Sequence, residues 1–202
     1  MKVYGLTGGT GSGKSEAAKR FREHGIPVID ADRLGHELIA PGGAAENAVR
    51  KAFGDKIGTC GKIDREKLGR IVFADPNALE RLNAIIQPAI RTEIGRRCAL
   101  LAAEQHHTVI IDAALIGDAG KLEPWLQALI LVTTPKAERM RRLVAQRGIS
   151  ADDAQRRIAA QVPPESKVSL ARWIIENDGS LQELRVRVDE IAEALYGLSL
   201  GS

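Results

Sequence analysis

The 202-residue chain has few cysteines and few aromatic residues, and each shortage excludes a class of protein. Cys60 and Cys98 are the only cysteines, and they form neither a CxxC motif nor a Cys/His metal spacing. A disulfide framework and a structural zinc site are therefore excluded, and both residues are expected to be reduced thiols. Aromatic residues make up 3% of the chain and are scattered, which argues against a base-stacking platform for single-stranded nucleic acid.

Long apolar runs and targeting signals are lacking too. No uncharged apolar run approaches the roughly 20 residues that a membrane-spanning helix needs. The first residues lead directly into a strand-like segment, without the basic start, apolar stretch and cleavage site of a signal peptide. Because 44% of the residues are hydrophobic and 27% are charged, a disordered chain is excluded as well. We expect a soluble, cytoplasmic protein with one compact domain and no membrane partner.

The formal net charge of +3 is distributed unevenly along the chain. Residues 136–172 contain nine basic and four acidic residues, so this segment is locally basic and the remainder is slightly acidic. Its arginines fall on two successive helical patterns separated by a glycine. Such a segment is typical of a lid that folds over a polyphosphate, although a charged helix face is often only solvated. We expect Arg142 and Arg147 to contact phosphate, followed by Arg139.

Short apolar segments alternate with helical patterns along the whole chain. The predicted strands are 3–6, 27–29, 108–111, 128–132 and 172–175. The predicted helices are 14–23, 32–39, 44–53, 65–73, 79–84, 88–104, 136–146, 150–160 and 181–195. The strands are continuously apolar, as in a parallel sheet covered on both faces, so the pattern predicts a doubly wound α/β protein. The long helical excursion after the second strand is too large for one crossover and predicts a subdomain.

A phosphate-binding loop is the strongest motif in the sequence. Residues 8–15 match GxxxxGK[ST], directly after an apolar strand and at the start of a helix. In such a loop, glycines such as Gly8, Gly11 and Gly13, together with Ser12, let backbone N–H groups converge on phosphate oxygens. Lys14 would then reach the β- and γ-phosphates of ATP, and the Ser15 hydroxyl would bind Mg²⁺. The alternative is a glycine-rich turn between a strand and a helix.

Acidic residues follow two of the predicted strands. Asp30 and Asp32 flank an alanine at the end of the second strand, where a carboxylate can accept the proton of an attacking hydroxyl. Asp30 also suits a helix cap. Asp112 ends the third strand and is predicted either to bind Mg²⁺ or to cap the following turn. Asp118, six residues later, would contact the phosphoryl acceptor or only solvent.

With these residues assembled, the chain resembles the dephospho-CoA kinase family over nearly its whole length. The matching pieces are residues 6–15, Val28-Ile29-Asp30-Ala31-Asp32, Phe53-Gly54, Gly61-Lys62-Ile63-Asp64-Arg65 with Leu68, Val72-Phe73, Ala160-Gln161 with Lys167, and Trp173-Ile174-Ile175-Glu176-Asn177-Asp178-Gly179-Ser180. The phosphate loop alone fits many families, whereas the ordered set is far more specific.

The resemblance implies a three-layer P-loop kinase fold, with a five-stranded parallel sheet flanked by helices. It divides the chain into a core (1–32, 106–135 and 170–202), a helical substrate-binding subdomain (33–105) and a helical lid (136–169). It also implies an ATP- and Mg²⁺-dependent enzyme that phosphorylates the ribose 3′-hydroxyl of dephospho-CoA, the last step of coenzyme A synthesis. A monomer without nucleic-acid or membrane partners is expected, with a weak oligomer as the alternative.

The resemblance also suggests roles for particular residues. Asp32 looks like the base, with Lys14 and Arg142 as the other catalytic residues. The expected ATP contacts are Gly8, Gly11, Ser12, Gly13, Lys14, Ser15, Glu16, Arg139, Arg147 and Asn177. The expected substrate contacts are Asp30, Arg65, Gln87, Asp112 and Asp118, and the expected Mg²⁺ ligands are Ser15 and Asp112.

Several positions depart from the family pattern. Ala114 stands where proline is usual, Asp118 where glutamate is usual, and Gln87 where histidine is usual. The usual lid glutamine is missing, and Arg172 replaces an aspartate before the last strand. These departures leave two alternatives open, another P-loop small-molecule or nucleotide kinase and a non-catalytic nucleotide-binding paralogue. A nucleic-acid-dependent NTPase is disfavoured by the mild charge and the few aromatic residues.

Overall fold

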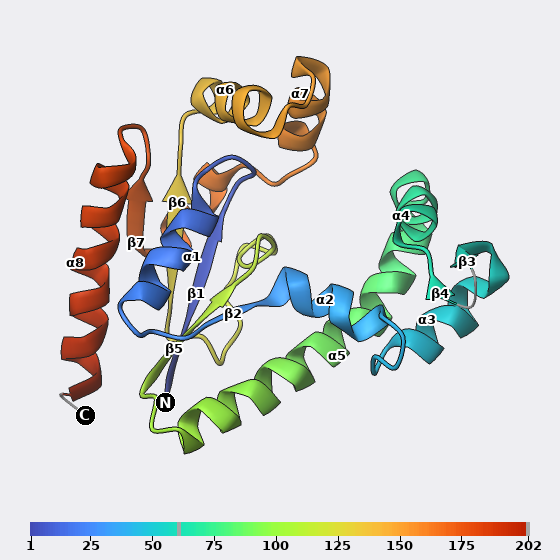
Figure 1. Ribbon diagram of the computed structural model, residues 1–202, viewed down its shortest axis with the longest axis horizontal. Coiled ribbons are helices and arrows are strands. Elements are labelled where there is room, and N and C mark those ends of the chain that lie inside the picture. The colour runs from blue at the N-terminus through green and yellow to red at the C-terminus, as the bar shows by residue number, and fades with distance from the viewer. Residues whose placement is uncertain (60–61, 201–202) are drawn as a thin grey trace. The chain divides into compact units, whose positions relative to one another are not determined.

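The computed structural model describes residues 1–59 and 62–200, and the chain divides into two compact units (Figure 1). The first unit contains residues 1–29 and 101–202, and the second contains residues 30–100. Within the described residues, no helix is both long and apolar enough to cross a membrane.

A five-stranded parallel sheet forms the centre of the first unit, with strand order β2-β5-β1-β6-β7. Its strands are β1 (Lys2–Gly8), β2 (Val28–Asp30), β5 (Thr108–Asp112), β6 (Ala128–Thr133) and β7 (Ala171–Glu176). Every residue of β5 is buried, as expected for a strand covered on both faces. All five predicted strands are confirmed, and their ends shift by one or two residues.

Two helices pack together on one face of this sheet. They are α1 (Lys14–Glu23) and α8 (Leu181–Leu200), and Figure 1 shows them side by side. Phe21 of α1 is fully buried in the same core as Leu6, Val188 and Leu195. Full burial of a side chain of this size contributes about 1.5–3 kcal/mol. This packing fixes α1, and with it the start of the helix that follows the phosphate loop.

An ion pair between partly exposed side chains also joins α1 to α8. Arg20 of α1 donates two hydrogen bonds to the Asp189 carboxylate, at 2.6 and 2.8 Å, and His24 Nε2 lies 2.6 Å from the same group. The Arg20 guanidinium lowers the pKa of Asp189 to about 2, and burial opposes that shift. Asp189 is therefore ionised at neutral pH and ties the two helices together.

The predicted lid region contains a separate small core. Helix α6 (Lys136–Arg147) ends at Gly148, whose φ is 63°, and α7 (Ala151–Ala159) follows with Ser150 as its N-cap. Leu143, Ala154 and Ile158 pack between the two helices. A 3₁₀ helix, η2 (Pro164–Leu170), then leads into β7. The two helices thus hold each other through contacts of their own.

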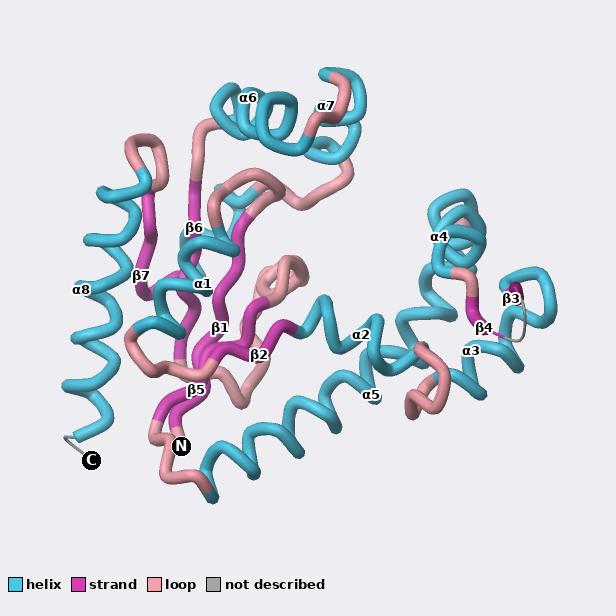
Figure 2. Tube along the Cα trace, in the orientation of Figure 1, coloured by secondary structure: helices cyan, strands magenta, loops and turns pink. Residues whose placement is uncertain are grey.

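Helices make up almost all of the second unit (Figure 2). Its elements are α2 (Ala31–Ile39), α3 (Glu46–Phe53), η1 (Gly54–Ile57), the short strands β3 (Gly58–Thr59) and β4 (Lys62–Ile63), α4 (Arg65–Ala74) and α5 (Pro76–Ala103). Leu38, Val49, Phe53, Leu68 and Val72 form its apolar core. This unit therefore has a hydrophobic core separate from that of the sheet.

One sequence prediction for this unit is wrong. The two helices predicted at 79–84 and 88–104 are a single helix, α5, with Pro88 inside it. A proline in a helix interior removes one hydrogen bond and usually ends the helix. Here Ile85, Ile86, Ala89 and Ile90, on both sides of the proline, pack against the same apolar core and hold the helix together. Helix α5 begins at Pro76, directly after Asp75, the C-cap of α4.

The shortest elements escaped the sequence analysis. Strands β3 and β4 have two residues each, and η1 and η2 are 3₁₀ segments, so none is long enough to produce a periodic pattern. Helix α3 also begins at Glu46, two residues later than predicted. Cys98 is a free, partly buried thiol, as predicted, and Cys60 lies outside the described residues.

Candidate active site

The phosphate loop connects β1 to α1 in the predicted strand–loop–helix arrangement. Gly13 stands at the N-cap of α1 with φ 91°, a left-handed conformation that side chains disfavour. A Cβ at this position would lie 2.1 Å from the Asn177 side-chain nitrogen, so only glycine fits. Backbone contact between Ser12 N and Gly9 O, at 3.0 Å, closes the loop. The loop ends on the positive end of a helix dipole, which favours an anionic ligand.

Two buried polar side chains support this loop from behind. The Asn177 amide nitrogen donates to the Ser12 carbonyl at 2.8 Å, and Thr134 Oγ1 lies 3.0 Å from the same oxygen. Both residues are only 4% exposed. Asn177 was predicted to contact ATP; it lies beneath the loop and contacts Ser12, so its amide fixes the backbone that would bind phosphate.

Lys14 of the motif forms an ion pair with Asp112, the last residue of β5. Strands β1 and β5 run in parallel register, with Leu6 opposite Asp112, so the end of β5 lies beside the phosphate loop. The Asp112 side chain is 8% exposed and the Lys14 side chain 16%. With a nucleotide bound, phosphate oxygens would replace the Asp112 carboxylate as the negative partner of Lys14. A divalent cation would likewise replace the Lys14 ammonium as the positive partner of Asp112.

The residues present fit a nucleotide-bound Mg²⁺ ion. Ser15, exposed in the first turn of α1, and Asp112 supply oxygen atoms, which Mg²⁺ prefers. In the part of the chain that the structure describes, no three His, Cys, Asp or Glu side chains group as a metal site. This arrangement suits an ion held mainly by phosphate oxygens and water, with few protein ligands. Glu16, the next residue, is exposed in the same helical turn.

The arginine that lies against the phosphate loop is Arg139. It belongs to the first turns of α6 and is 4% exposed. A Cβ on Gly9 would lie 2.1 Å from Arg139 Nη1, so the guanidinium lies across this glycine. Its Nε is buried and, among the described residues, has no hydrogen-bond partner. A positive group is thus held directly over the loop.

The other predicted lid arginines lie differently. Arg142 Nε donates to Glu138 at 2.8 Å, and its Nη2 donates to the Asn177 carbonyl at 3.2 Å. Hydrogen bonds from Arg141 and Arg142 lower the pKa of Glu138 to about 2, so this carboxylate stays ionised. Arg142 is thereby fixed beside the segment that supports the phosphate loop. The side chain of Arg147 lies outside the described part of the structure.

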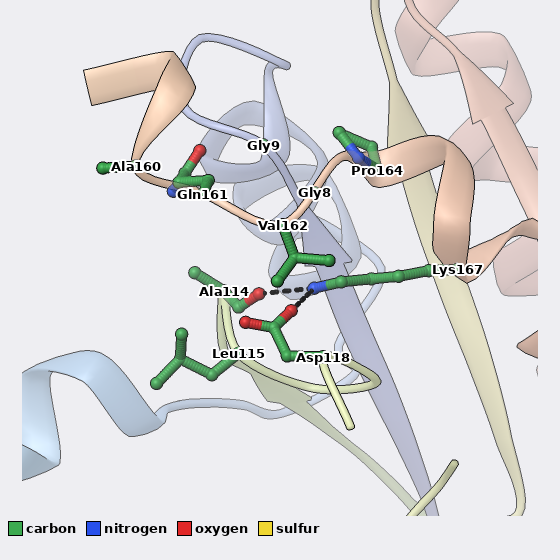
Figure 3. A pocket seen from close by; sticks show the side chains of 10 residues that line it. All are labelled: Gly8, Gly9, Ala114, Leu115, Asp118, Ala160, Gln161, Val162, Pro164 and Lys167. Carbon is green, nitrogen blue, oxygen red and sulfur yellow. Dashed lines mark hydrogen bonds and ion pairs between the residues drawn. The ribbon is translucent and has the colours of Figure 1, made fainter. Parts of the chain in front are cut away.

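A cavity of about 90 Å³ opens beside the start of the phosphate loop (Figure 3). Three segments line it: the loop itself, the turn after β5, and the chain between α7 and η2. The lining residues are Gly8, Gly9, Ala114, Leu115, Asp118, Ala160, Gln161, Val162, Pro164 and Lys167. Gln161 Oε1 accepts a hydrogen bond from the Thr10 backbone N–H at 2.7 Å, which ties the end of the lid region to the phosphate loop.

Lys167 is a site residue that the sequence analysis did not assign to the site. It is 3% exposed and forms an ion pair with Asp118. Asp118 was predicted to contact either the phosphoryl acceptor or only solvent. The only sequence signal for it was its place in a matching family segment. A lysine in a segment of prolines and serines gives no indication in the sequence that it is buried. Its burial depends on an ion-pair partner that lies far away in the sequence.

Asp32, the predicted base, and the nearby Asp30 lie at the start of the second unit. Asp30 accepts a hydrogen bond from the Arg33 backbone N–H at 2.8 Å and so caps α2, as one of its two predicted readings required. Asp32 is exposed in the first turn of the same helix. The cap holds the helix start, and it fixes the backbone from which the Asp32 carboxylate projects.

The predicted substrate contacts on the later helices are spread over two elements. Arg65 opens α4 and its Nη2 lies 3.0 Å from His36 Nε2 of α2. Gln87 is partly buried on α5, next to Pro88. Within this unit, Arg65 and His36 thus form an exposed basic pair, separate from Gln87.

Comparisons with known proteins show the family that the chain resembles. The family model for dephospho-CoA kinase (CoaE) matches residues 2–183. A dephospho-CoA kinase of Streptomyces avermitilis is 42% identical over 194 residues, which cover 95% of this chain and 92% of the relative. One from Anaeromyxobacter dehalogenans is 37% identical and covers 98% and 93%. The crystal structure of TT1252 from Thermus thermophilus superposes with a TM-score of 0.82 at 32% identity, covering 96% and 97%.

Proposed function

The chain belongs to the dephospho-CoA kinase family, and on that premise we propose that it transfers the γ-phosphoryl group of ATP to the ribose 3′-hydroxyl of dephospho-CoA. The products are CoA and ADP, so the reaction is the last step of coenzyme A synthesis. The family, the kinase activity and the P-loop fold predicted from the sequence are confirmed. The observation that carries the chemistry is the ion pair between Lys14, at the end of the phosphate loop, and Asp112, at the end of β5.

Binding of the ATP phosphates falls to the loop and to Lys14. The backbone N–H groups around Gly11, Ser12 and Gly13, with the N-terminus of α1, bind phosphate oxygens. The Lys14 ammonium neutralises charge on the β- and γ-phosphates. Arg139, held against Gly9, adds positive charge at the point where the γ-phosphoryl group leaves. Preorganised charges of this kind need little rearrangement during the transfer.

We propose that Ser15 and Asp112 hold Mg²⁺. Such an ion would supply positive charge that neutralises the negative charge developing on the phosphates during transfer. The Ser15 hydroxyl and the Asp112 carboxylate orient the ion, and Lys14 stays beside both through its contact with Asp112. Removal of either oxygen donor should therefore weaken catalysis more than it weakens folding.

The acceptor hydroxyl needs a base, and we propose Asp32 for this role. Its carboxylate is exposed at the start of α2, whose cap is Asp30, so it is available to a bound hydroxyl. Asp32 orients the 3′-hydroxyl and accepts its proton as the new P–O bond forms. Asp30, Arg65, Gln87, Asp112 and Asp118 are the proposed substrate contacts.

The remaining parts of the proposal concern larger segments. The helical region 33–105 binds the adenosine and pantetheine parts of the substrate, and the region 136–169 closes over ATP. Arg142 and Arg147, with Glu16, complete the proposed contacts to ATP. The enzyme is proposed to act as a cytoplasmic monomer, which sedimentation at several protein concentrations tests.

A coupled assay of ADP release tests the acceptor. Dephospho-CoA is compared with a panel of nucleosides and sugars, at equal ATP and Mg²⁺. We expect ADP release that depends on dephospho-CoA. Faster turnover with another acceptor would favour a different P-loop kinase, an alternative that Ala114 and Gln87 keep open. ATP binding without turnover on any acceptor would favour the non-catalytic paralogue.

A further inference from the structure

A buried lysine joins three segments around the phosphate loop. The Lys167 ammonium donates to the Ala114 carbonyl at 2.8 Å and forms an ion pair with Asp118 (Figure 3). It also lies 3.4 Å from Thr7 Oγ1. An ammonium group has three N–H donors. Two of them are used in hydrogen bonds to Ala114 and Thr7, and the charge of the ammonium is matched by the Asp118 carboxylate.

The three segments are those that carry the phosphate-binding groups. Thr7 immediately precedes Gly8 in β1, and its hydroxyl also donates to the Ala114 carbonyl at 3.0 Å. Ala114 follows Asp112, the partner of Lys14, by two residues. The contacts of Lys167 therefore reach both strands whose ends form the site, β1 and β5.

The third segment is η2, which follows the predicted lid. Lys167 lies within η2, and Gln161, at the other end of the same connection, contacts the Thr10 backbone. The chain that leaves α7 is thus attached to the site at two points, and the cavity of about 90 Å³ lies between them. A change at Lys167 would alter one wall of this cavity and the end of the lid region together.

The energetics favour a positioning role over simple packing. Taking an ammonium and a carboxylate out of water costs several kcal/mol for each ion, which a good pair offsets only in part. An apolar pair would hold the segments at a lower cost in solvation. An ion pair, however, fixes direction as well as distance, and it does so beside the residues that bind phosphate.

We propose that Lys167 and Asp118 are a positioning pair for phosphoryl transfer. They hold the turn after β5 against β1 and η2, and so keep Asp112 and Lys14 in the geometry that receives the nucleotide phosphates. This proposal rests on the proposed function. The pair acts through the turn after β5 and not on the reacting atoms, so Asp118 takes this role in place of the substrate contact proposed above. Asp118, one methylene shorter than the family's usual glutamate, reaches Lys167 directly.

The test compares single and double neutral variants. Lys167→Met leaves the partly buried Asp118 carboxylate unpaired, and Asp118→Asn leaves the buried Lys167 ammonium unpaired. Each variant is expected to lower kcat about 100-fold, the size of effect that a misplaced site produces. The KM for ATP should change less than about threefold, because the loop itself is intact. The double variant removes both charges and should recover kcat at least about tenfold over Lys167→Met.

Controls separate this effect from loss of folding. Lys121→Met, an exposed lysine just beyond the same turn, should keep wild-type kcat. Asp118→Glu keeps the charge and should stay within about threefold of wild type, whereas Asp118→Asn should not. Thermal unfolding and binding of a fluorescent ATP analogue establish that each variant is folded. Should Lys167→Met fail to fold, the contrast between the two Asp118 variants decides.

Two results would overturn the proposal. Wild-type kcat in Lys167→Met would remove any role for the pair. A double variant no more active than Lys167→Met would mean that Lys167 acts on the transferring phosphate itself.

Hydrogen exchange without substrate gives an independent readout: residues 113–120 should exchange faster in Lys167→Met and slow again in the double variant. If the wild-type protein does not phosphorylate dephospho-CoA, the proposed function is wrong. The hydrogen-exchange rates of residues 113–120 still test whether Lys167 and Asp118 hold this turn in place.

Discussion

At the scale of single residues, the site depends on a few side chains whose surroundings are unusual. Gly13 has no room for a side chain, Lys167 carries a buried charge, and Asp112 faces Lys14 at the end of a buried strand. Asp32, in contrast, is exposed in the first turn of α2. The first three are buried or closely packed, whereas Asp32 lies on the surface of its unit.

Replacement of Asp32 by asparagine tests the base. Asparagine keeps the size but cannot accept the proton, so kcat should fall by about 100- to 10,000-fold, the range for loss of a general base. ATP binding should persist, since the phosphate loop lies elsewhere in the sequence. Steady-state ADP release and binding of an ATP analogue measure the two effects. Unchanged kcat would remove Asp32 as the base.

Replacement of Gly13 by alanine tests the phosphate loop. The new Cβ would meet the Asn177 nitrogen and would force a left-handed backbone, so the loop must change shape. We expect ATP affinity to fall by at least about tenfold, equivalent to about 1.4 kcal/mol. The matched control is Gly95→Ala, since a Cβ there meets no atom within 4 Å. ATP affinity equal to that of wild type in Gly13→Ala would contradict the assigned loop geometry.

At the scale of elements, α1 has to be held firmly because it carries the phosphate loop. Its buried face packs against the sheet and α8, and its exposed edge is tied through Arg20 and His24 to Asp189. Helix α5 illustrates the same rule in the second unit, where apolar contacts on both sides of Pro88 maintain a helix that local sequence would break. Tertiary packing therefore decides helix boundaries where local propensity is weak or adverse.

The α1–α8 ion pair predicts a pH-dependent stability. The pKa of Asp189 is about 2 in the folded chain, below its usual value of about 3.9. Its contribution is thus fully present above about pH 4 and is lost as the pH falls towards about 2. Asp189→Asn should destabilise by about 1 kcal/mol at neutral pH, after allowance for solvent screening of this partly exposed pair.

Thermal unfolding measures this difference. For a chain of this size, about 1 kcal/mol corresponds to a fall in Tm of about 2–4 °C. The gap between wild type and Asp189→Asn should narrow as the pH is lowered through about 4. Glu190→Gln, an exposed neighbour on α8, serves as the control and should change Tm little. A gap that stays constant at acid pH would contradict the role given to this carboxylate.

At the scale of the whole molecule, nucleotide binding should report on the first unit. A ligand at about 100 times its Kd stabilises the folded state by about 2.7 kcal/mol, so Mg²⁺-ATP should raise Tm by about 5–10 °C. Lys14→Met should abolish most of this rise, whereas Lys19→Met, on the exposed side of α1, should retain it. Chelation of Mg²⁺ by EDTA should abolish turnover. A full rise in Lys14→Met would contradict phosphate binding by this lysine.

Much of the fold could be predicted from the sequence because its signals are local. The five strands are apolar runs, and α1 begins immediately after the GxxxxGK[ST] motif, so both appear in short windows. The continuity of α5 could not be predicted, because it depends on apolar partners from other helices. The two-residue strands β3 and β4 were missed because they are too short to show a period.

The candidate site divides in the same way. The sequence by itself determined the phosphate loop, the acidic pair around Ala31 and the basic segment 136–172, because each is a contiguous stretch with a chemical reason for its composition. Only the tertiary structure decided that Asn177 supports the loop from beneath, that Arg139 lies across Gly9, and that Lys167 meets Asp118. These contacts join residues far apart in the chain, so burial and charge pairing, which depend on the packed sheet and its connections, determine what each side chain does.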